Sequence, residues 1–141
     1  LHRLAAWAAA TIAPERRFTG KGIVRIVPSD NDDALHAIWA DPLYLAPPSA
    51  REIFGLVRLT DRAAEAARQV STPALMLLGT QDQIVPNRTV REVFAHVPGE
   101  TRVIEYPEGW HLLFRDRQAA RVWEDVATWA LDAAPPEGCP E

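Results

Sequence analysis

Hydrophobic and polar positions follow their most regular pattern in the second half of the chain. Residues 74–78 (ALMLL) form a continuous apolar run, typical of a strand buried on both faces of a parallel sheet. Residues 101–106 (TRVIEY) read as a second strand. Apolar residues at helical spacing follow each run, at 87–97 and in a final helix that Asp116 is expected to cap. The order strand, helix, strand, helix predicts a parallel βαβα unit and places the chain in the α/β class.

The first half of the chain has weaker patterns, most of them helical. Residues 1–13 are rich in alanine and predict a helix with Trp7 as its apolar anchor. Residues 29–33 (SDNDD) offer capping side chains for a short helix that ends near residue 40. Ser49 can cap a longer amphipathic helix, or two helices in succession. Residues 23–27 (IVRIV) predict a short strand or extended segment before Pro28.

The composition is that of an ordinary globular domain. The chain has 141 residues, 48% of them hydrophobic and 24% charged, which excludes collagenous, coiled-coil and wholly disordered classes. Its 15 Lys and Arg against 19 Asp and Glu give a net charge of −4, with no basic run. Nucleic acid and anionic membrane surfaces are therefore not expected as partners.

The longest apolar run and the single cysteine indicate the cellular compartment in which the protein is expected. The longest apolar run, residues 4–13, is too short for a membrane span, and an amphipathic helix explains it at least as well as a signal peptide does. Cys139 lies alone in a Pro-rich tail, so an intrachain disulfide and a Cys-based metal site are excluded. The aspartates of 29–33 lack the spacing of a calcium loop. We therefore expect a cytoplasmic protein without a metal or cofactor.

The predicted sheet is too small to be stable by itself. Two parallel strands, or three with the doubtful 23–27 segment, are fewer than a sheet normally has, and so apolar a strand as 74–78 needs a neighbour on each side. We expect the unit to complete a larger sheet, supplied by upstream sequence, a second chain or a dimer partner. The first residue is Leu1 rather than Met, which favours a start further upstream.

Candidate chemistry lies in the two loops that follow the strands. Residues 79–86 (GTQDQIVP) contain Asp82, and residues 107–114 (PEGWHLLF) contain His111. Loops that leave the carboxyl ends of parallel strands emerge at one edge of the sheet, so these two side chains can meet there. A carboxylate that holds one imidazole nitrogen leaves the other free to take a proton from a nucleophile. The structural alternative is that Asp82 is a turn residue and His111 a packed loop histidine.

Together these stretches resemble a known family. The segments STPALMLLGTQDQIVP and RVIEYPEGWHLLF, with the Trp-containing helix after them, look like the C-terminal portion of α/β-hydrolases of the monoacylglycerol lipase and lysophospholipase type. The segments SDNDDALHAIWADPLYL and REIFGLVRLTDRAAEAA look like the cap region and the following helix of that group. The resemblance covers nearly the whole chain, to about residue 131.

The resemblance implies a fold, a domain organisation and an activity. Residues 1–48 would form a mostly helical cap, residues 49–133 the C-terminal part of the hydrolase core, and residues 134–141 a flexible tail. Asp82 would be the acid and His111 the base of a Ser-His-Asp triad. That triad would hydrolyse carboxylic esters such as monoacylglycerols or lysophospholipids, without a cofactor.

The chain departs from the family in lacking a nucleophile motif. Its only serines are Ser29, Ser49 and Ser71, and none stands in the G-x-S-x-G elbow of the family. The oxyanion loop of the family is also missing. By itself the chain should be inactive, so an upstream half of the fold would have to supply the nucleophile. The alternative from another class is a non-catalytic remnant or interaction domain that keeps the hydrolase scaffold.

Aromatic residues are the candidates for substrate contact. Trp110 lies beside His111 and either lines the substrate pocket or covers the edge of the sheet. Trp39 and Tyr44, with Trp7, could form an acyl-binding wall or simply pack in a core. Trp123 and Trp129 share one helical face and are expected in the core. Packing or surface exposure is the simpler reading of the remaining histidines, which are His2, His36 and His96.

Overall fold

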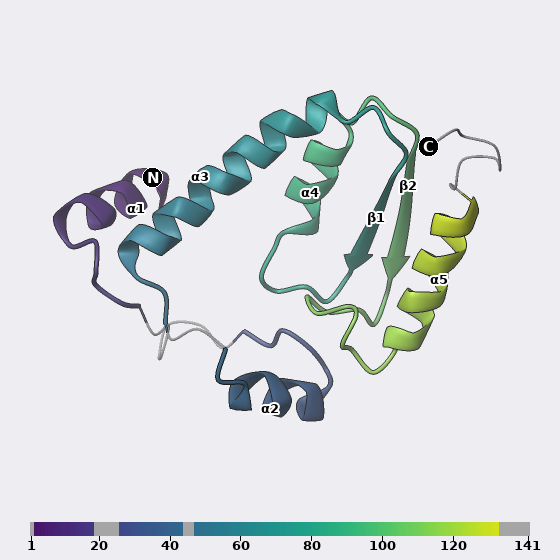
Figure 1. Ribbon diagram of the computed structural model, residues 1–141, viewed down its shortest axis with the longest axis horizontal. Helices are drawn as coiled ribbons and strands as arrows, with labels where there is room; N and C mark the ends of the chain where they lie inside the picture. The colour runs from purple at the N-terminus through teal and green to yellow at the C-terminus, as the bar shows by residue number, and fades with distance from the viewer. Residues whose placement is uncertain (1, 19–25, 44–46, 133–141) are drawn as a thin grey trace, which may run out of the picture.

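The computed structural model describes residues 2–18, 26–43 and 47–132. In chain order its elements are α1 (His2–Ile12), α2 (Asp32–Ala40), α3 (Ala50–Ala66), the 3₁₀ turn η1 (Ala67–Gln69), β1 (Ala74–Gly79), α4 (Asn87–Phe94), β2 (Thr101–Tyr106) and α5 (Ala119–Asp132). The strands pair in parallel, with Ala74 opposite Thr101 and Gly79 opposite Tyr106. The expected α/β class and its parallel βαβα unit are confirmed, and both strands lie within a residue of their predicted bounds (Figure 1).

Of the described α-helices, two lie beside the strands and the other three lie further away. Figure 1 shows α4 beside β1 and α5 beside β2, while α3 extends from α4 to α1, which packs against it. The short helix α2 lies beyond the carboxyl ends of both strands (Figure 1). The described helices include none that is long and apolar enough to cross a bilayer.

Local sequence explains where the longest helix begins. The Ser49 hydroxyl accepts a hydrogen bond from the Glu52 N–H at 3.3 Å, and the Glu52 carboxylate accepts one from the Ser49 N–H at 2.6 Å. This reciprocal pair satisfies two N–H groups that the first turn leaves without helical partners. The predicted N-cap role of Ser49 is confirmed, and α3 is one continuous helix rather than two.

The hydrophobic core is small and lies between the sheet and α5. Tyr106, Leu113 and Val122 are buried together, and the half-buried Leu77 and Ile104 pack against them. Leu113 belongs to the loop that also carries His111, so this loop is anchored in the core through Leu113. Tyr106 additionally donates its hydroxyl proton to Asp125 on α5, at 2.9 Å.

Several predictions about aromatic residues and helix starts were wrong. Trp7 is 54% exposed and Trp123 is 55% exposed, so neither is a core residue here. The Trp123 ring instead donates to the Phe114 carbonyl at 3.3 Å, whereas Trp129 is half-buried. Asp116 does not cap α5 with its side chain, which accepts instead from the Ser29 hydroxyl and from the Trp110 N–H.

The start of α2 also differs in detail from the prediction. Asn31 alone caps this helix, accepting from the Ala34 N–H at 3.2 Å, while Ser29 and Asp30 bond to a different part of the chain. Of the predicted strand 23–27, residues 23–25 lie outside the described residues, and 26–27 have no regular structure. Tyr44 and the tail with Cys139 also lie outside the described residues.

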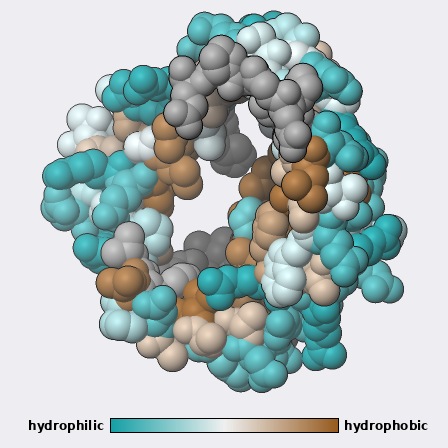
Figure 2. All heavy atoms as spheres, turned by 45° about the vertical axis from the view of Figure 1, so that its right-hand side comes forward, coloured by the Kyte–Doolittle hydropathy of each residue, from teal (hydrophilic) through white to brown (hydrophobic). Residues whose placement is uncertain are grey.

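β1 is only partly covered. Met76 and Leu78 are buried, but Leu75 and Leu77 are only half-buried, so the strand is not enclosed on both faces as expected. An apolar groove of about 690 Å³ lies between β1, α3 and α4. We call this apolar groove the β1 groove. Hydrophobic residues also gather along the central opening that Figure 2 shows.

Candidate active site

The loops after β1 and β2 leave the sheet at one edge and are bonded to each other. The Thr80 N–H donates to the Tyr106 carbonyl at 3.0 Å, and the Thr80 hydroxyl donates to the Pro107 carbonyl at 2.6 Å. The Gln81 N–H donates to the Gly109 carbonyl at 2.9 Å. These bonds fix the backbone of the Asp82 loop relative to the backbone of the His111 loop.

Asp82 and His111 meet where these two loops run together. The Asp82 Oδ2 lies 2.9 Å from Nδ1 of His111, a hydrogen-bond distance. The other oxygen, Oδ1, accepts from the N–H groups of Ile84 at 2.7 Å and Val85 at 3.0 Å. Asp82 is therefore a turn residue and the partner of His111 at the same time. The expected contact with His111 and the turn bonds thus occur together on one side chain.

The electrostatics of the pair follow from these bonds. Partial burial raises the pKa of the Asp82 carboxyl, but the hydrogen bonds from His111 and from the Val85 and Ile84 N–H groups outweigh it and hold that pKa below its usual range. Asp82 is therefore a carboxylate at neutral pH, and Nδ1 of His111 donates to it. The Asp82 side chain is 12% exposed and that of His111 34%, so the imidazole is the more exposed member of the pair.

Asn87 is a supporting residue that the sequence analysis missed. Its side-chain amide donates to the Gly79 carbonyl at 2.8 Å, across the turn that contains Asp82. The sequence pattern predicts only that a helix begins near residue 87. The helix in fact has Pro86 at its N-cap position, without a side-chain bond to the first turn. An Asn that lies beside a candidate site and does not cap a helix is a signal that its side chain holds the neighbouring backbone.

The proposed substrate-contact residues lie in different places. Trp110 is half-buried and directly precedes His111, and its N–H donates to the Asp116 carboxyl at 2.7 Å. Trp39 is 58% exposed on α2, where its ring packs edge-on against His36 with centroids 5.9 Å apart. Tyr44 lies outside the described residues. Of these three residues, Trp110 is the one that the structure places beside the Asp82–His111 pair.

The serines of the described chain have other partners or places. Ser29 is buried and donates to Asp116, and Ser49 is buried as the N-cap of α3. Ser71 is exposed and lies against Gly99, at the amino ends of the strands. In residues 2–18, 26–43 and 47–132 no serine hydroxyl is hydrogen-bonded to His111.

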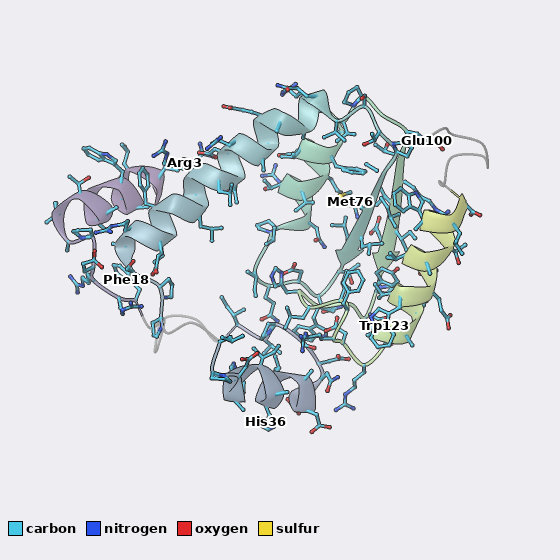
Figure 3. The ribbon with its side chains drawn as sticks, in the orientation of Figure 1. Arg3, Phe18, His36, Met76, Glu100 and Trp123 are labelled. Atoms are coloured by element: carbon cyan, nitrogen blue, oxygen red, sulfur yellow. The ribbon has the colours of Figure 1, made fainter. Side chains whose placement is uncertain are left out.

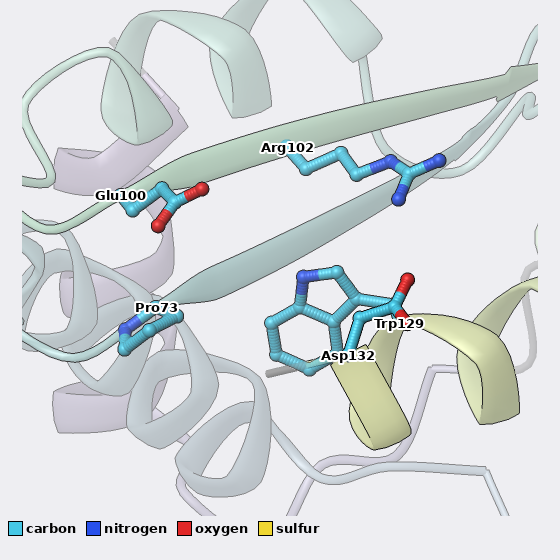
Figure 4. A pocket seen from close by; sticks show the side chains of 5 residues that line it. All are labelled: Pro73, Glu100, Arg102, Trp129 and Asp132. Atoms are coloured by element: carbon cyan, nitrogen blue, oxygen red, sulfur yellow. The ribbon is translucent and has the colours of Figure 1, made fainter. Parts of the chain in front are cut away.

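A second cavity lies at the opposite edge of the sheet. It has a volume of about 330 Å³, and the residues that line it are Pro73, Glu100, Arg102, Trp129 and Asp132 (Figure 4). Figure 3 shows Glu100 at the end of the sheet away from α2, which carries His36. This cavity is therefore remote from Asp82 and His111. As for metals, the described residues contain no group of three or more His, Cys, Asp or Glu side chains that could hold one.

The parallel βαβα unit places the chain in the α/β class, and a family comparison gives the particular family. The chain belongs to the hydrolase family described as serine aminopeptidase, S33, whose model matches residues 1–118. The solved structures it resembles include the monoacylglycerol lipase of Paleococcus ferrophilus, with a TM-score of 0.77 and 23% identity over 94% of this chain.

A second similar structure comes from a study of LipS and LipT, two metagenome-derived lipolytic enzymes. It has a TM-score of 0.57 and 16% identity over 92% of this chain. The alignments cover 52% of the Paleococcus lipase and 61% of the second chain, so this chain spans about half to three-fifths of their lengths. No curated protein matches the chain. The chain therefore has part of the α/β-hydrolase fold that these two solved structures share.

Proposed function

We propose that the chain supplies the acid and the base of a Ser-His-Asp triad in a carboxylic ester hydrolase. The observation that carries the proposal is the 2.9 Å contact between Asp82 Oδ2 and His111 Nδ1 at the carboxyl edge of the sheet. In α/β sheets this edge is where ligands bind. The lowered pKa of Asp82 and the partial exposure of His111 suit the two roles.

The reaction uses the two nitrogens of His111 differently. A serine from outside this chain loses its proton to Nε2 and attacks the ester carbonyl, forming a tetrahedral intermediate whose oxyanion backbone N–H groups stabilise. Asp82 stabilises the imidazolium that forms. His111 then gives the proton to the leaving alkoxide, so the alcohol departs and an acyl-enzyme remains. Water repeats the sequence, with His111 again as base, and releases the acid.

The substrate class proposed is monoacylglycerol or lysophospholipid. A monoacylglycerol lipase and lipolytic enzymes among the similar structures support this choice. Residues 1–48 would act as the cap over the site and residues 49–133 as part of the core. Trp110 beside His111, and Trp39 on the cap side, are the apolar groups available for an acyl chain.

The remainder of the fold would provide the nucleophile and the oxyanion donors. The β1 groove supports this view, because its lining is mostly apolar and β1 has an unpaired edge in the described sheet. A further parallel strand with its helix would cover both. It would come from an upstream half of the same protein or from a homo-oligomer partner. We use "intact protein" below for this chain together with whatever completes its sheet.

The test is turnover of the intact protein on a short p-nitrophenyl ester and on a long-chain monoacylglycerol. Asp82→Asn is expected to lower kcat by about 10⁴-fold and His111→Ala by about 10⁶-fold. His96→Ala is the matched control, because His96 bonds to its own helix at the Glu92 carbonyl and should not affect turnover. Wild-type rates in Asp82→Asn and His111→Ala would refute the triad assignment.

A non-catalytic interaction domain is the second candidate function. The observation in its favour is that the sequence has no G-x-S-x-G motif, while the β1 groove is available for a partner. Labelling of the intact protein with a fluorophosphonate, followed by peptide mapping, separates the two. A labelled serine supports the hydrolase. An unlabelled protein that sediments as a stable complex supports the interaction domain.

A further inference from the structure

The segment that precedes α2 is bonded along its whole length to the chain around His111. Each residue from 28 to 31 has a partner there. The bonds are Leu112 N–H to the Pro28 carbonyl at 3.0 Å, Ser29 hydroxyl to Asp116 at 2.6 Å, Arg117 N–H to Asp30 at 2.9 Å, and the Asn31 amide to the Arg115 carbonyl at 2.9 Å. A segment from the cap side thus holds the loop that carries the candidate catalytic base.

Asp116 is the buried centre of this contact. It is 2% exposed, and Ser29 is 1% exposed. One carboxyl oxygen accepts from the Ser29 hydroxyl, and the other accepts from the Trp110 N–H at 2.7 Å. A buried carboxyl group is costly unless donors satisfy its oxygens, so this arrangement depends on both bonds. The mechanism proposed above makes no use of it.

The bond to Trp110 is the one that reaches the site. Trp110 directly precedes His111, so a restraint on the Trp110 N–H is a restraint on the backbone that carries the imidazole. From the other side the Gln81 N–H bonds to the Gly109 carbonyl, one residue earlier. Gly109 and Trp110 are therefore held from two directions, by the Asp82 loop and by Asp116.

We propose that Ser29 and Asp116 are positioning residues for His111. They orient the His111 loop so that Nδ1 faces Asp82 and Nε2 faces the nucleophile, and they tie this orientation to the cap-side segment 28–31. Catalytic geometry is sensitive to displacements of about 1 Å, which can change a rate by about 10²-fold. The turnover effect rests on the proposed function, whereas the effect on the Asp82–His111 contact does not.

The test compares two buried serines in the intact protein. Ser29→Ala removes the donor to Asp116, and Ser49→Ala is the matched control, because it removes an equally buried hydroxyl at the N-cap of α3. The readouts are the ¹H NMR signal of the His111 Nδ1–H and the separate values of kcat and KM. Ser29→Ala should broaden or shift that signal and lower kcat about tenfold, with KM within about twofold. Ser49→Ala should leave the signal, kcat and KM unchanged.

A conservative variant adds a rescue test. Asp116→Asn keeps an oxygen for the Trp110 N–H and places an amide donor near the Ser29 oxygen, so it should retain most of the turnover and the Nδ1–H signal. Asp116→Ala keeps neither bond and should lose both. Equal loss in the Asn and Ala variants would contradict the proposal, and Ser29→Ala remains decisive if Asp116→Ala does not fold.

The outcomes separate this inference from the proposed function. If Ser29→Ala and Ser49→Ala affect the Nδ1–H signal equally, Ser29 has only a general structural role and the inference is wrong. If the wild-type protein hydrolyses no ester, the proposed function fails, and the NMR comparison alone then decides whether Ser29 and Asp116 position His111.

Discussion

Gly79 and Gly109 lie in direct contact at the carboxyl edge of the sheet. A Cβ atom on Gly109 would lie 3.0 Å from the Cα of Gly79, and a Cβ on Gly79 would lie 2.5 Å from the Gly109 carbonyl oxygen. These distances leave no room for a side chain on either residue. The close approach of the two backbones is what brings Asp82 within hydrogen-bond distance of His111.

Gly79→Ala should therefore force the two loops apart. The new Cβ would lie 2.4 Å from the Trp110 carbonyl oxygen, which is backbone and cannot swing away as a side chain would. We expect a loss of about 1–3 kcal/mol in the free energy of unfolding, measured by urea denaturation. Gly55→Ala on α3 is the control. A Cβ there meets nothing within 4 Å, so it should stabilise by about 0.5–1 kcal/mol. Equal effects in the two variants would contradict the steric argument.

Asp82 should contribute stability that is lost in acid. Its pKa is held below the ordinary value of 3.8, mainly because hydrogen bonds from His111 and two backbone N–H groups outweigh partial burial. A depressed folded pKa gives stability that is fully present above the unfolded pKa and disappears as the pH falls through the folded one. Asp82→Asn should be less stable than wild type near pH 6, on the order of 1 kcal/mol, and equally stable near pH 2. A gap between the two proteins that stays constant with pH would disprove this linkage.

Tyr106 should contribute stability that is lost in alkali. Burial, reinforced by the hydrogen bond to Asp125, raises its pKa from 10.0 to about 12. A raised folded pKa gives a contribution that is complete below the unfolded pKa, here about 10, and that is lost as the pH rises toward 12. Tyr106→Phe should cost about 1 kcal/mol at pH 7, and denaturation curves at several pH values should show the gap closing above pH 10. The assignment fails if the wild-type curve does not fall in that interval.

The strands and the meeting of Asp82 with His111 could be predicted because short-range rules govern them. The apolar run 74–78 can be stable only as a covered strand, and the connection to residues 101–106 through one helix requires parallel pairing. Parallel pairing in turn places both loops at one edge. The Ser49 capping box was also predictable, since it depends only on residues three apart.

The Ser29–Asp116 contact could not be predicted in the same way. The two residues are 87 positions apart, and each has a plausible local role as a helix cap, which is the role we predicted for both. Nothing in the sequence shows that these side chains bond to each other rather than to the first turn of the adjacent helix. The exposure of Trp7 and Trp123 was missed because amphipathic spacing shows which face of a helix is apolar, and not whether a second surface covers it.

The β1 groove allows the completion of the sheet to be tested by placing a charge in it. Val93 lies on α4 and lines the groove, so Val93→Glu in the 141-residue chain alone puts the carboxylate beside an open, solvated surface and should cost at most about 1 kcal/mol. In the intact protein an added strand would cover the groove. The same carboxylate would then be buried without a partner, at a cost of about 3 kcal/mol or more in the free energy of unfolding.

Val70→Glu is the matched control for this comparison. Val70 is 37% exposed and lies at the amino edge of the sheet, where its carbonyl accepts from the Gly99 N–H. A change there should cost about 0.5 kcal/mol or less in both settings, because the side chain stays in solvent in each. Urea denaturation of the wild type and of both variants, in each of the two settings, gives the comparison directly. A Val93→Glu penalty that is the same with and without the remainder would mean that the groove stays open, and that the sheet is completed elsewhere or not at all.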